Sequence, residues 1–285
     1  MRRSEINAFC ENKGWLFEDL KAAFQRAGVR ASDEPHPTSE AYICIRSSEL
    51  SKSPRYDRTV VQIHDLKPPT NLAAFEATCG LSFMHPIQAW YWRNAGYKGR
   101  FMTLPIGARD AITLPKSMPQ NPTVGFFCGE DKQFNKGSPL FAKAVQLARK
   151  VAPFDCLLIG RGLKHISNLG HYEEHAALPE DYARIDVLVC TSRSPAVPLS
   201  VYEAMAAGKP VISTPRWIPG EKLPAVHFAE TAEELAQKIC AVLAAREKNF
   251  RNRRQLRWRE YLFSDWLKAN INFTKTAVRD YYDRL

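Results

Sequence analysis

One stretch of this sequence, residues 184–214, constrains the fold more than any other. It reads RIDVLVCTSRSPAVPLSVYEAMAAGKPVIST. The apolar run from Ile185 to Cys190 contains several β-branched residues, which is typical of a strand buried on both faces. Two prolines, Pro195 and Pro198, then exclude regular structure from the loop that follows. The first part of the stretch therefore predicts a buried strand that ends in an irregular loop.

A short helix and a second strand complete the stretch. Ser200 is a favourable N-cap and Gly208 a favourable C-cap, so we expect a two-turn helix between them and a strand at 211–213. A helix N-terminus that follows a parallel strand is where α/β proteins commonly bind phosphate. Glu203 is expected in the first turn of this helix. Because its carboxylate repels phosphate, a hydroxyl-bearing group such as a ribose is its better partner.

Strands and helices are expected to alternate along the whole chain, which predicts an α/β protein with parallel sheets. The first half has expected strands at 5–10, 41–45, 59–63, 81–84 and 101–104, and expected helices at 17–27, 73–78 and 87–95. The second half adds strands at 123–128, 156–159 and 225–228, and helices at 139–151, 231–245 and 265–285. Helix 231–245 begins TAEE, which is a capping-box sequence.

This alternation divides into two domains around a polar stretch with three prolines. We expect a trimmed N-terminal domain at 1–107, a linker at 108–122 and a second domain at 123–264. The tail at 265–285 is expected to pack back on the N-terminal half. Two α/β domains whose loops lie at the carboxyl ends of their strands predict a ligand cleft between them.

The composition narrows the class of protein. The chain has 285 residues, of which 45% are hydrophobic, enough for one large or two modest cores. It has no apolar run of 18 residues, so no membrane span is expected, and its N-terminus lacks the apolar region of a signal peptide. Its 7 cysteines include no C-x-x-C pair, which favours reduced thiols in a core over metal ligands and predicts a cytoplasmic protein.

The formal net charge of +10 favours a polyanionic partner, such as a phosphorylated substrate, a nucleic acid or an anionic membrane surface. Part of this charge is concentrated in residues 246–259, REKNFRNRRQLRWR. The segment is either a solvated helix face or a contact for the phosphates of an acceptor or a lipid surface. The candidate contacts are Arg251, Arg253, Arg254 and Arg257.

Several pieces of the sequence resemble the retaining family 4 of the GT-B glycosyltransferases, the glycosyl transferases group 1. The most specific piece is PLSVYEAMAAGKPVIST, and VGFFCGEDKQFNKG, FDCLLIGRGL and LPEDYARIDVLVCTSRS support it. The first half matches more loosely, through VVQIHDL, FMHP and LPIGARD. The resemblance implies a GT-B fold, in which two Rossmann-like domains have parallel sheets that face each other across a cleft.

The resemblance also implies transfer of a sugar from a nucleoside-diphosphate sugar, with a UDP- or GDP-sugar expected as co-substrate and no cofactor. No carboxylate stands at DxD spacing from Asp65, so the sequence does not support a metal requirement. Glu203 would accept hydrogen bonds from the ribose. The backbone N–H groups of Leu199, Ser200 and Val201 would face the diphosphate, and Lys136 would neutralise the charge of the leaving group.

Other family positions map onto the remaining candidates. His64 would bind the transferred sugar or help to deprotonate the acceptor, unless it merely ends a strand. Gly160 and Gly162 would serve a tight turn over which a nucleobase lies.

Two positions depart from the family pattern. The family has a carboxylate eight positions before the helix glutamate, where this chain has Pro195. It has an arginine six positions before the lysine, where this chain has Glu130. We expect Lys132, Arg161 or Arg193 to supply the missing positive charge.

The acceptor stays open at this point. A glycan or a lipid-linked sugar at the cytosolic face of a membrane is favoured, and the charge also permits hydroxymethylated bases in DNA, as in phage-type glucosyltransferases. The two departures permit a degenerate GT-B protein that only binds its ligand. A nucleotide-sugar epimerase fits less well, because the chain lacks the carboxylate-rich site that such chemistry needs.

Overall fold

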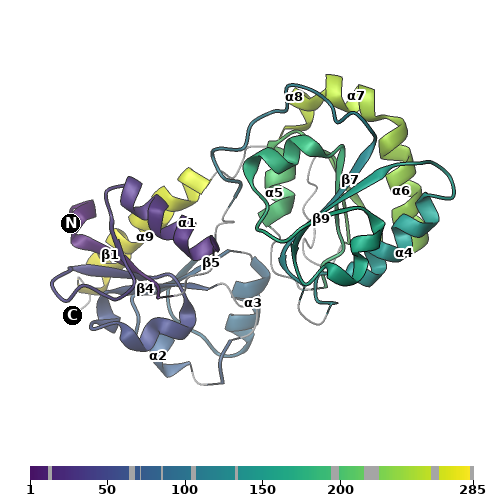
Figure 1. Cartoon of the computed structure of the whole chain (residues 1–285). Coiled ribbons are helices and arrows are strands. Elements are labelled where there is room, and N and C mark those ends of the chain that lie inside the picture. Colours follow the sequence, from purple (N-terminus) through teal and green to yellow (C-terminus); the bar gives the residue numbers. More distant parts are fainter. Residues whose placement is uncertain are drawn as a thin grey trace. The chain divides into compact units, whose positions relative to one another are not determined.

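The structure is a computed structural model of the whole chain (Figure 1). It describes residues 1–11, 15–63, 68–70, 72–84, 86–103, 107–131, 134–193, 199–214, 225–257 and 263–282. The chain forms two compact units. Unit 1 comprises Met1–Ile106 together with Ser264–Leu285, and unit 2 comprises Gly107–Phe263.

Unit 1 contains a six-stranded sheet in which all neighbouring strands are parallel. The strand order is β2-β1-β3-β4-β5-β6. The strands are β1 (Ile6–Phe9), β2 (Arg30–Ser32), β3 (Ala41–Cys44), β4 (Thr59–Ile63), β5 (Gly80–Phe83) and β6 (Phe101–Thr103). The four central strands β1, β3, β4 and β5 are buried along their whole length, as expected for parallel strands covered on both faces.

Helices cover both faces of this sheet (Figure 1). The elements are α1 (Trp15–Arg26), α2 (Ala73–Glu76), α3 (Pro86–Asn94) and α9 (Phe263–Tyr282), with short 3-10 turns between them. Although α9 is the last helix of the chain, it packs in unit 1. Its Trp266 ring lies 6.2 Å from that of Phe24 in α1, and its Asp280 forms a 2.6 Å ion pair with Arg100. The C-terminal helix thus completes the core of the N-terminal unit.

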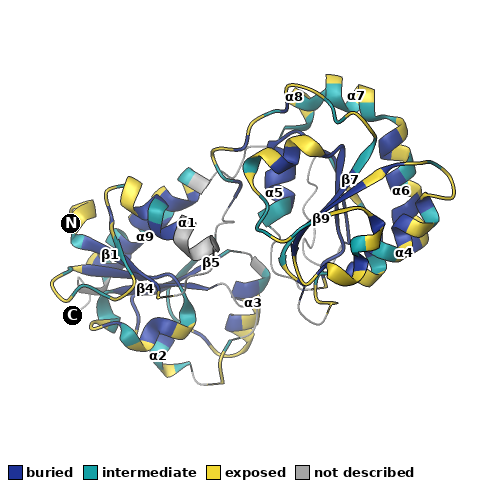
Figure 2. Ribbon diagram, viewed as in Figure 1, coloured by how far each residue is buried: buried dark blue, intermediate teal, exposed yellow. Residues whose placement is uncertain are grey.

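Unit 2 contains a second parallel sheet of six strands, in the order β12-β11-β10-β7-β8-β9. Its strands are β7 (Thr123–Glu130), β8 (Asp155–Arg161), β9 (His171–Glu173), β10 (Val187–Cys190), β11 (Val211–Ser213) and β12 (Val226–Phe228). Its α-helices are α4 (Ser138–Ala148), α5 (Leu199–Ala206), α6 (Ala232–Ala244), α7 (Arg246–Arg251) and α8 (Arg253–Leu256). Figure 2 shows the central strands β7, β8, β10 and β11 largely buried, and helices α4, α6 and α7 exposed along their outer faces.

Two hydrophobic clusters lie on opposite faces of this second sheet. Successive strand residues alternate between them: Val187 and Val189 belong to the cluster that includes α4 and α6, and Leu188 and Cys190 to the cluster that includes α5. This alternation follows from the two-residue period of a strand. The sheet is therefore doubly covered, which explains why its strands read as continuous apolar runs.

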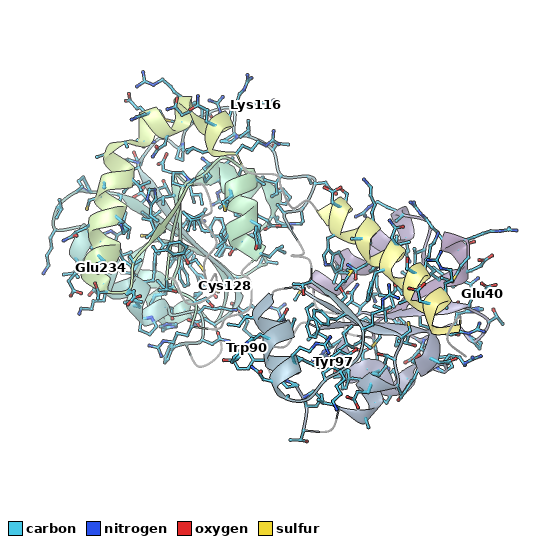
Figure 3. The ribbon with its side chains drawn as sticks, turned by 180° about the vertical axis from the view of Figure 1, so that it is seen from behind. Glu40, Trp90, Tyr97, Lys116, Cys128 and Glu234 are labelled. Carbon is cyan, nitrogen blue, oxygen red and sulfur yellow. The ribbon has the colours of Figure 1, made fainter. Side chains whose placement is uncertain are left out.

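The α/β prediction and the GT-B-like pair of parallel sheets are confirmed. Every strand expected from the sequence is present, with its described ends within two residues of the expected positions. The prediction missed β2 and β9, which are short edge strands of partly exposed residues and so lack an apolar pattern. The TAEE capping box at the start of α6 is also present, with Thr231 accepting from Glu234 N (Figure 3 labels Glu234).

Two details differ from the sequence prediction. The helix that carries Glu203 begins at Leu199 rather than after Ser200, so Glu203 lies in its second turn and not its first. Residues 108–122, expected as a linker, form part of unit 2, where Ala108 and Ile112 are buried in the α5 cluster. Because these two apolar residues lie in a polar, proline-rich stretch, no apolar pattern in the sequence indicated that they are buried.

Within the residues that the structure describes, no helix combines the length and the apolar character needed to cross a membrane.

The capping box gives a first stability prediction. Replacing Thr231 by Ala removes the side-chain acceptor for Glu234 N, and should lower the free energy of unfolding of unit 2 by about 1 kcal/mol. Thr231→Ser keeps a hydroxyl cap and serves as the control. It should lower the free energy of unfolding by only about a few tenths of a kcal/mol. Urea denaturation followed by circular dichroism measures both, and equal losses in the two variants would contradict the capping role.

Candidate functional site

The loops that follow β7 and β10 are pressed together at the carboxyl end of the second sheet. Gly137 has a φ of +75°, and a Cβ atom there would lie 2.0 Å from the carbonyl oxygen of Thr191. The Thr191 hydroxyl donates to the carbonyls of Lys136 and Gly137, at 3.0 and 2.9 Å. Arg193 N donates to the Asn135 carbonyl at 2.9 Å. Only glycine fits at position 137, and this close approach fixes the backbone around Lys136.

The side chain of Lys136 is half-buried at this edge of the sheet. Burial raises the pKa of the Cys128 thiol to about 12, and the charge of Lys136 opposes that rise. Burial also raises the pKa of Cys190, again opposed by Lys136. The two thiols lie near the ends of β7 and β10 (Figure 3 labels Cys128), so the Lys136 charge acts across the ends of both strands.

Asp131, directly after β7, is a polar residue that the sequence analysis did not single out. Its Oδ1 atom accepts from Lys136 N at 2.7 Å, and its backbone N–H donates to the Arg161 carbonyl at 3.0 Å. Asp131 is only 6% exposed, and its Oδ2 atom has no hydrogen-bond partner among the described residues. The sequence signal that could have identified Asp131 was an acidic residue at the end of a buried strand.

The turn after β8 contains the predicted Gly160-Arg161-Gly162 sequence. Gly160 has a φ of +141°, and a Cβ atom there would lie 2.3 Å from the Cys128 carbonyl oxygen. Gly162 has a φ of +77°, which also favours glycine. Both glycines therefore serve the turn itself. Arg161 and Arg193 are exposed, at the ends of β8 and just beyond β10 respectively.

Helix α5 carries the remaining predicted donor residues. Leu199 and Ser200 are half-buried and Val201 is buried. The helix ends in a Schellman motif, in which Gly208 N donates to the Met205 carbonyl and Lys209 N to the Ala204 carbonyl, both at 2.9 Å. Gly208 adopts a φ of +67°, as its predicted capping role requires.

Glu203 of α5 is 2% exposed and is held by two partners. Arg109 Nε donates to Glu203 Oε1, and Arg109 Nη2 donates to Oε2 at 3.0 Å. The Tyr182 hydroxyl donates to Oε2 at 2.6 Å. Burial raises the pKa of Glu203, and hydrogen bonding to Arg109 and the charge of Arg109 are the main opposing influences. This buried carboxylate is thus engaged within the protein.

Arg109 is another residue of this site that the sequence analysis missed. It lies 94 positions before Glu203 in the sequence, and its Nη2 atom also donates to the Ala177 carbonyl at 2.6 Å. No local pattern pairs two residues at such a separation. The available sequence signal was its position in LPIGARD, one of the pieces that resemble the family.

A charged cluster lies beside this site, on β9 and the segment after it. Glu173 accepts from His171, His175 and Arg184, and Arg184 also donates to Asp181 at 2.9 Å. Glu173, His175 and Asp181 lie close enough together to hold a metal ion. However, the guanidinium of Arg184 already bridges the two carboxylates and supplies the positive charge there.

Two arginines of the basic segment make contacts inside unit 2. Arg253 Nε donates to the Pro115 carbonyl and Arg257 Nε to the Ala206 carbonyl, each at 3.1 Å. These bonds attach α8 and the residue after it to the 108–122 segment and to the end of α5. The predicted polyanion contacts Arg253 and Arg257 therefore also have a structural role, whereas Arg251 and Arg254 are exposed.

Five positions named in the sequence analysis, His64, Asp65, Lys132, Pro195 and Pro198, lie outside the described residues. His64 directly follows β4 in the sequence.

The two nitrogens of His175 face acceptors, which gives a pH-dependent prediction. Nε2 lies 2.6 Å from Glu173 Oε2 and Nδ1 lies 2.7 Å from the Ala176 carbonyl, so both bonds form only in the imidazolium. The bond to Glu173 raises the pKa of His175, with further contributions from Ala176 and Asp181. A raised folded-state pKa stabilises the protein below the unfolded value of about 6.5, and this stabilisation is lost as the pH rises through the folded value.

We therefore expect the free energy of unfolding of unit 2 to fall as the pH rises above about 6.5, and His175→Gln to abolish this dependence. The change should be below about 1 kcal/mol, because the His175 side chain is 37% exposed and solvent screens its charge. His171→Gln is the matched control, since His171 contacts the same Glu173 from a more exposed position. Chemical denaturation between pH 5.5 and 9 checks this, and a loss of the dependence in both variants would contradict it.

Comparison with known proteins gives a family match and several similar structures. Residues 121–245 match the family model described as glycosyl transferases group 1. No curated protein sequence matches the chain.

Several solved structures share the fold. TarM of S. aureus is 15% identical, with a TM-score of 0.66 over 82% of this chain and 55% of TarM. Sucrose-phosphate synthase of Thermosynechococcus elongatus is 15% identical, with a TM-score of 0.64 over 98% of this chain and 99% of that one. WaaG, a glycosyltransferase involved in lipopolysaccharide biosynthesis, is 15% identical, with a TM-score of 0.67 over 94% and 99%.

This chain thus spans about half the length of TarM and nearly the full length of the other two. The whole-chain likenesses and the family match agree on the architecture. The chain therefore has the GT-B fold, and its residues 121–245 match the family model of the glycosyl transferases group 1.

Proposed function

We propose that the protein transfers a sugar from a nucleoside-diphosphate sugar to an acceptor hydroxyl, with retention of anomeric configuration. The observation that carries this proposal is the family match over residues 121–245, which contain α5, Glu203 and Lys136. The structures of TarM and of the pneumococcal O-GlcNAc transferase GtfA were both determined with UDP. These complexes support UDP as the first nucleotide to test.

The nucleotide binds at the carboxyl end of the second sheet in this proposal. The N-terminus of α5, with the N–H groups of Leu199, Ser200 and Val201, faces the diphosphate. Glu203, one turn further along α5, accepts from the ribose. The turn at Gly160 lies against the base, and Lys132, Arg161 and Arg193 are the further candidates for contact with the phosphates.

The proposed chemistry requires stabilisation of a leaving group. The bond between the sugar C1 atom and the diphosphate oxygen breaks, and negative charge grows on the nucleoside diphosphate. Lys136 neutralises that charge, which stabilises the transition state more than the bound donor. The acceptor oxygen forms the new bond to C1 and loses its proton, and His64 is the proposed group that assists this loss or binds the sugar.

The acceptor we propose is a glycan or a lipid-linked sugar, reached by peripheral contact with a membrane surface. The involvement of WaaG in lipopolysaccharide biosynthesis supports this class by analogy of fold. Hydroxymethylated DNA is less well supported, because Arg253 and Arg257 of the basic segment bond to carbonyls inside unit 2.

Turnover of a donor panel tests the reaction. UDP-, GDP- and ADP-sugars are incubated with the protein, and release of the nucleoside diphosphate is measured together with thermal stabilisation. We expect one nucleotide series to be turned over and to raise the melting temperature. If the whole panel gives binding without turnover, the protein is a binding subunit; if it gives neither, the proposed function is wrong.

Substitution of Lys136 tests its part in the reaction. Lys136→Ala should lower kcat about 100-fold, because the positive charge at the leaving group is lost. Lys143→Ala is the control, since Lys143 lies on α4 of the same unit with its side chain 63% exposed. An unchanged kcat in Lys136→Ala would contradict the assignment.

The two exposed arginines distinguish a DNA acceptor from a glycan. If DNA is the acceptor, its binding should weaken steeply with added salt, and Arg251→Ser with Arg254→Ser should reduce that salt dependence. For a glycan acceptor we expect activity that salt and these two substitutions leave nearly unchanged. The measurement is transfer to hydroxymethylated DNA and to a glycan acceptor between 50 and 300 mM salt, concentrations that bracket roughly physiological ionic strength.

A further inference from the structure

The carboxylate of Glu203 has no acceptor position left for a ligand. A carboxylate offers about four lone-pair sites. The Arg109 side chain donates to both oxygens and the Tyr182 hydroxyl donates to Oε2. A hydrogen bond from the Arg109 backbone N–H also lowers the pKa of Glu203. These four donors, all from within unit 2, satisfy the carboxylate completely.

Arg109 is in turn held in place from a second side. Its Nη2 atom donates to the Ala177 carbonyl at 2.6 Å as well as to Glu203. Its side chain is 17% exposed, whereas that of Glu203 is 2% exposed. The more exposed member of the pair is therefore the arginine, and it has a second acceptor that can retain one of its N–H groups when Glu203 is released.

We propose that Arg109 is an internal competitor of the nucleotide: the ribose hydroxyls take the place of the Arg109 guanidinium on Glu203. This inference rests on the proposed function, in which Glu203 binds the ribose. The paired form of the free protein does not accept a ribose, and binding requires the form in which Arg109 has left the carboxylate. The measured affinity is then the intrinsic affinity reduced by the fraction of molecules in that open form.

The two possible roles of Arg109, as a competitor of the nucleotide or as a support of the site, predict opposite effects of its removal on nucleotide binding. If Arg109 supported the site, its loss would weaken nucleotide binding. If it competes, Arg109→Gln should lower the melting temperature of the free protein, because a buried ion pair is lost, and yet tighten nucleotide binding. We expect binding tighter by about tenfold or more, since charge-assisted hydrogen bonds no longer have to be broken.

The dependence of binding on the ribose hydroxyls tests the competition specifically. UDP, GDP and ADP are each titrated by calorimetry at pH 8, because burial raises the pKa of Glu203 and removal of the Arg109 guanidinium raises it further. The nucleotide that binds is then compared with its 2′,3′-dideoxy form. Arg109→Gln should tighten binding of the ribonucleotide and leave that of the dideoxynucleotide unchanged.

Three variants control for damage to the fold. Arg184→Gln removes another ion-pair arginine of unit 2 and should lower stability without tightening binding. Tyr182→Phe removes a single donor from Glu203 and should tighten ribonucleotide binding by less than Arg109→Gln does. Arg109→Lys retains a cation opposite Glu203 and should stay nearest to the native affinity.

The results of these titrations distinguish a failure of the competition from a failure of the proposed function. Tighter binding that depends on the ribose hydroxyls supports the competition. Weaker or unchanged binding in both Arg109→Gln and Tyr182→Phe overturns it, although nucleotide binding by the native protein would leave the proposed function standing. Binding of none of the three nucleotides by the native protein overturns both.

Discussion

The buried pair of Glu203 and Arg109 is the interaction on which the rest of unit 2 depends. It joins α5 to the segment that enters the unit at Gly107, and through Ala177 it reaches the residues after β9. A carboxylate this deeply buried would be costly without its guanidinium partner, whose two parallel N–H groups match its two oxygens. Three parts of the chain that are far apart in sequence are thereby fixed at one point, beneath the helix that the family resemblance identifies with nucleotide binding.

The sequence predicted most of the architecture because burial on both faces leaves a strong apolar signal. The core strands of both sheets were found in this way, and β2 and β9 were missed because they are short edge strands with partly exposed residues. Local motifs with a defined hydrogen-bonding role, such as TAEE at α6 and Gly208 after α5, were also placed correctly. The start of α5 was not, since Ser200 is a good capping residue that the structure uses inside the helix.

The site was harder to predict than the fold, and for a physical reason. Lys136 and Glu203 stand in recognisable local contexts, whereas the partner of Glu203 comes from a segment that reads as a linker. Local sequence contains no information about a contact across 94 positions. The Asp131 oxygen that lacks a partner among the described residues and the bridging Arg184 are likewise properties of packing, which local sequence does not show.

The bonds of Arg253 and Arg257 to backbone carbonyls have a consequence for solution conditions. Exposed ion pairs weaken as counter-ions screen them, with a Debye length of about 8 Å at physiological ionic strength. Hydrogen bonds to neutral carbonyls inside the protein, such as those to Pro115 and Ala206, are far less sensitive to screening. Unit 2 should therefore keep its C-terminal helical segment attached in concentrated salt, even though that segment is among the most highly charged in the chain.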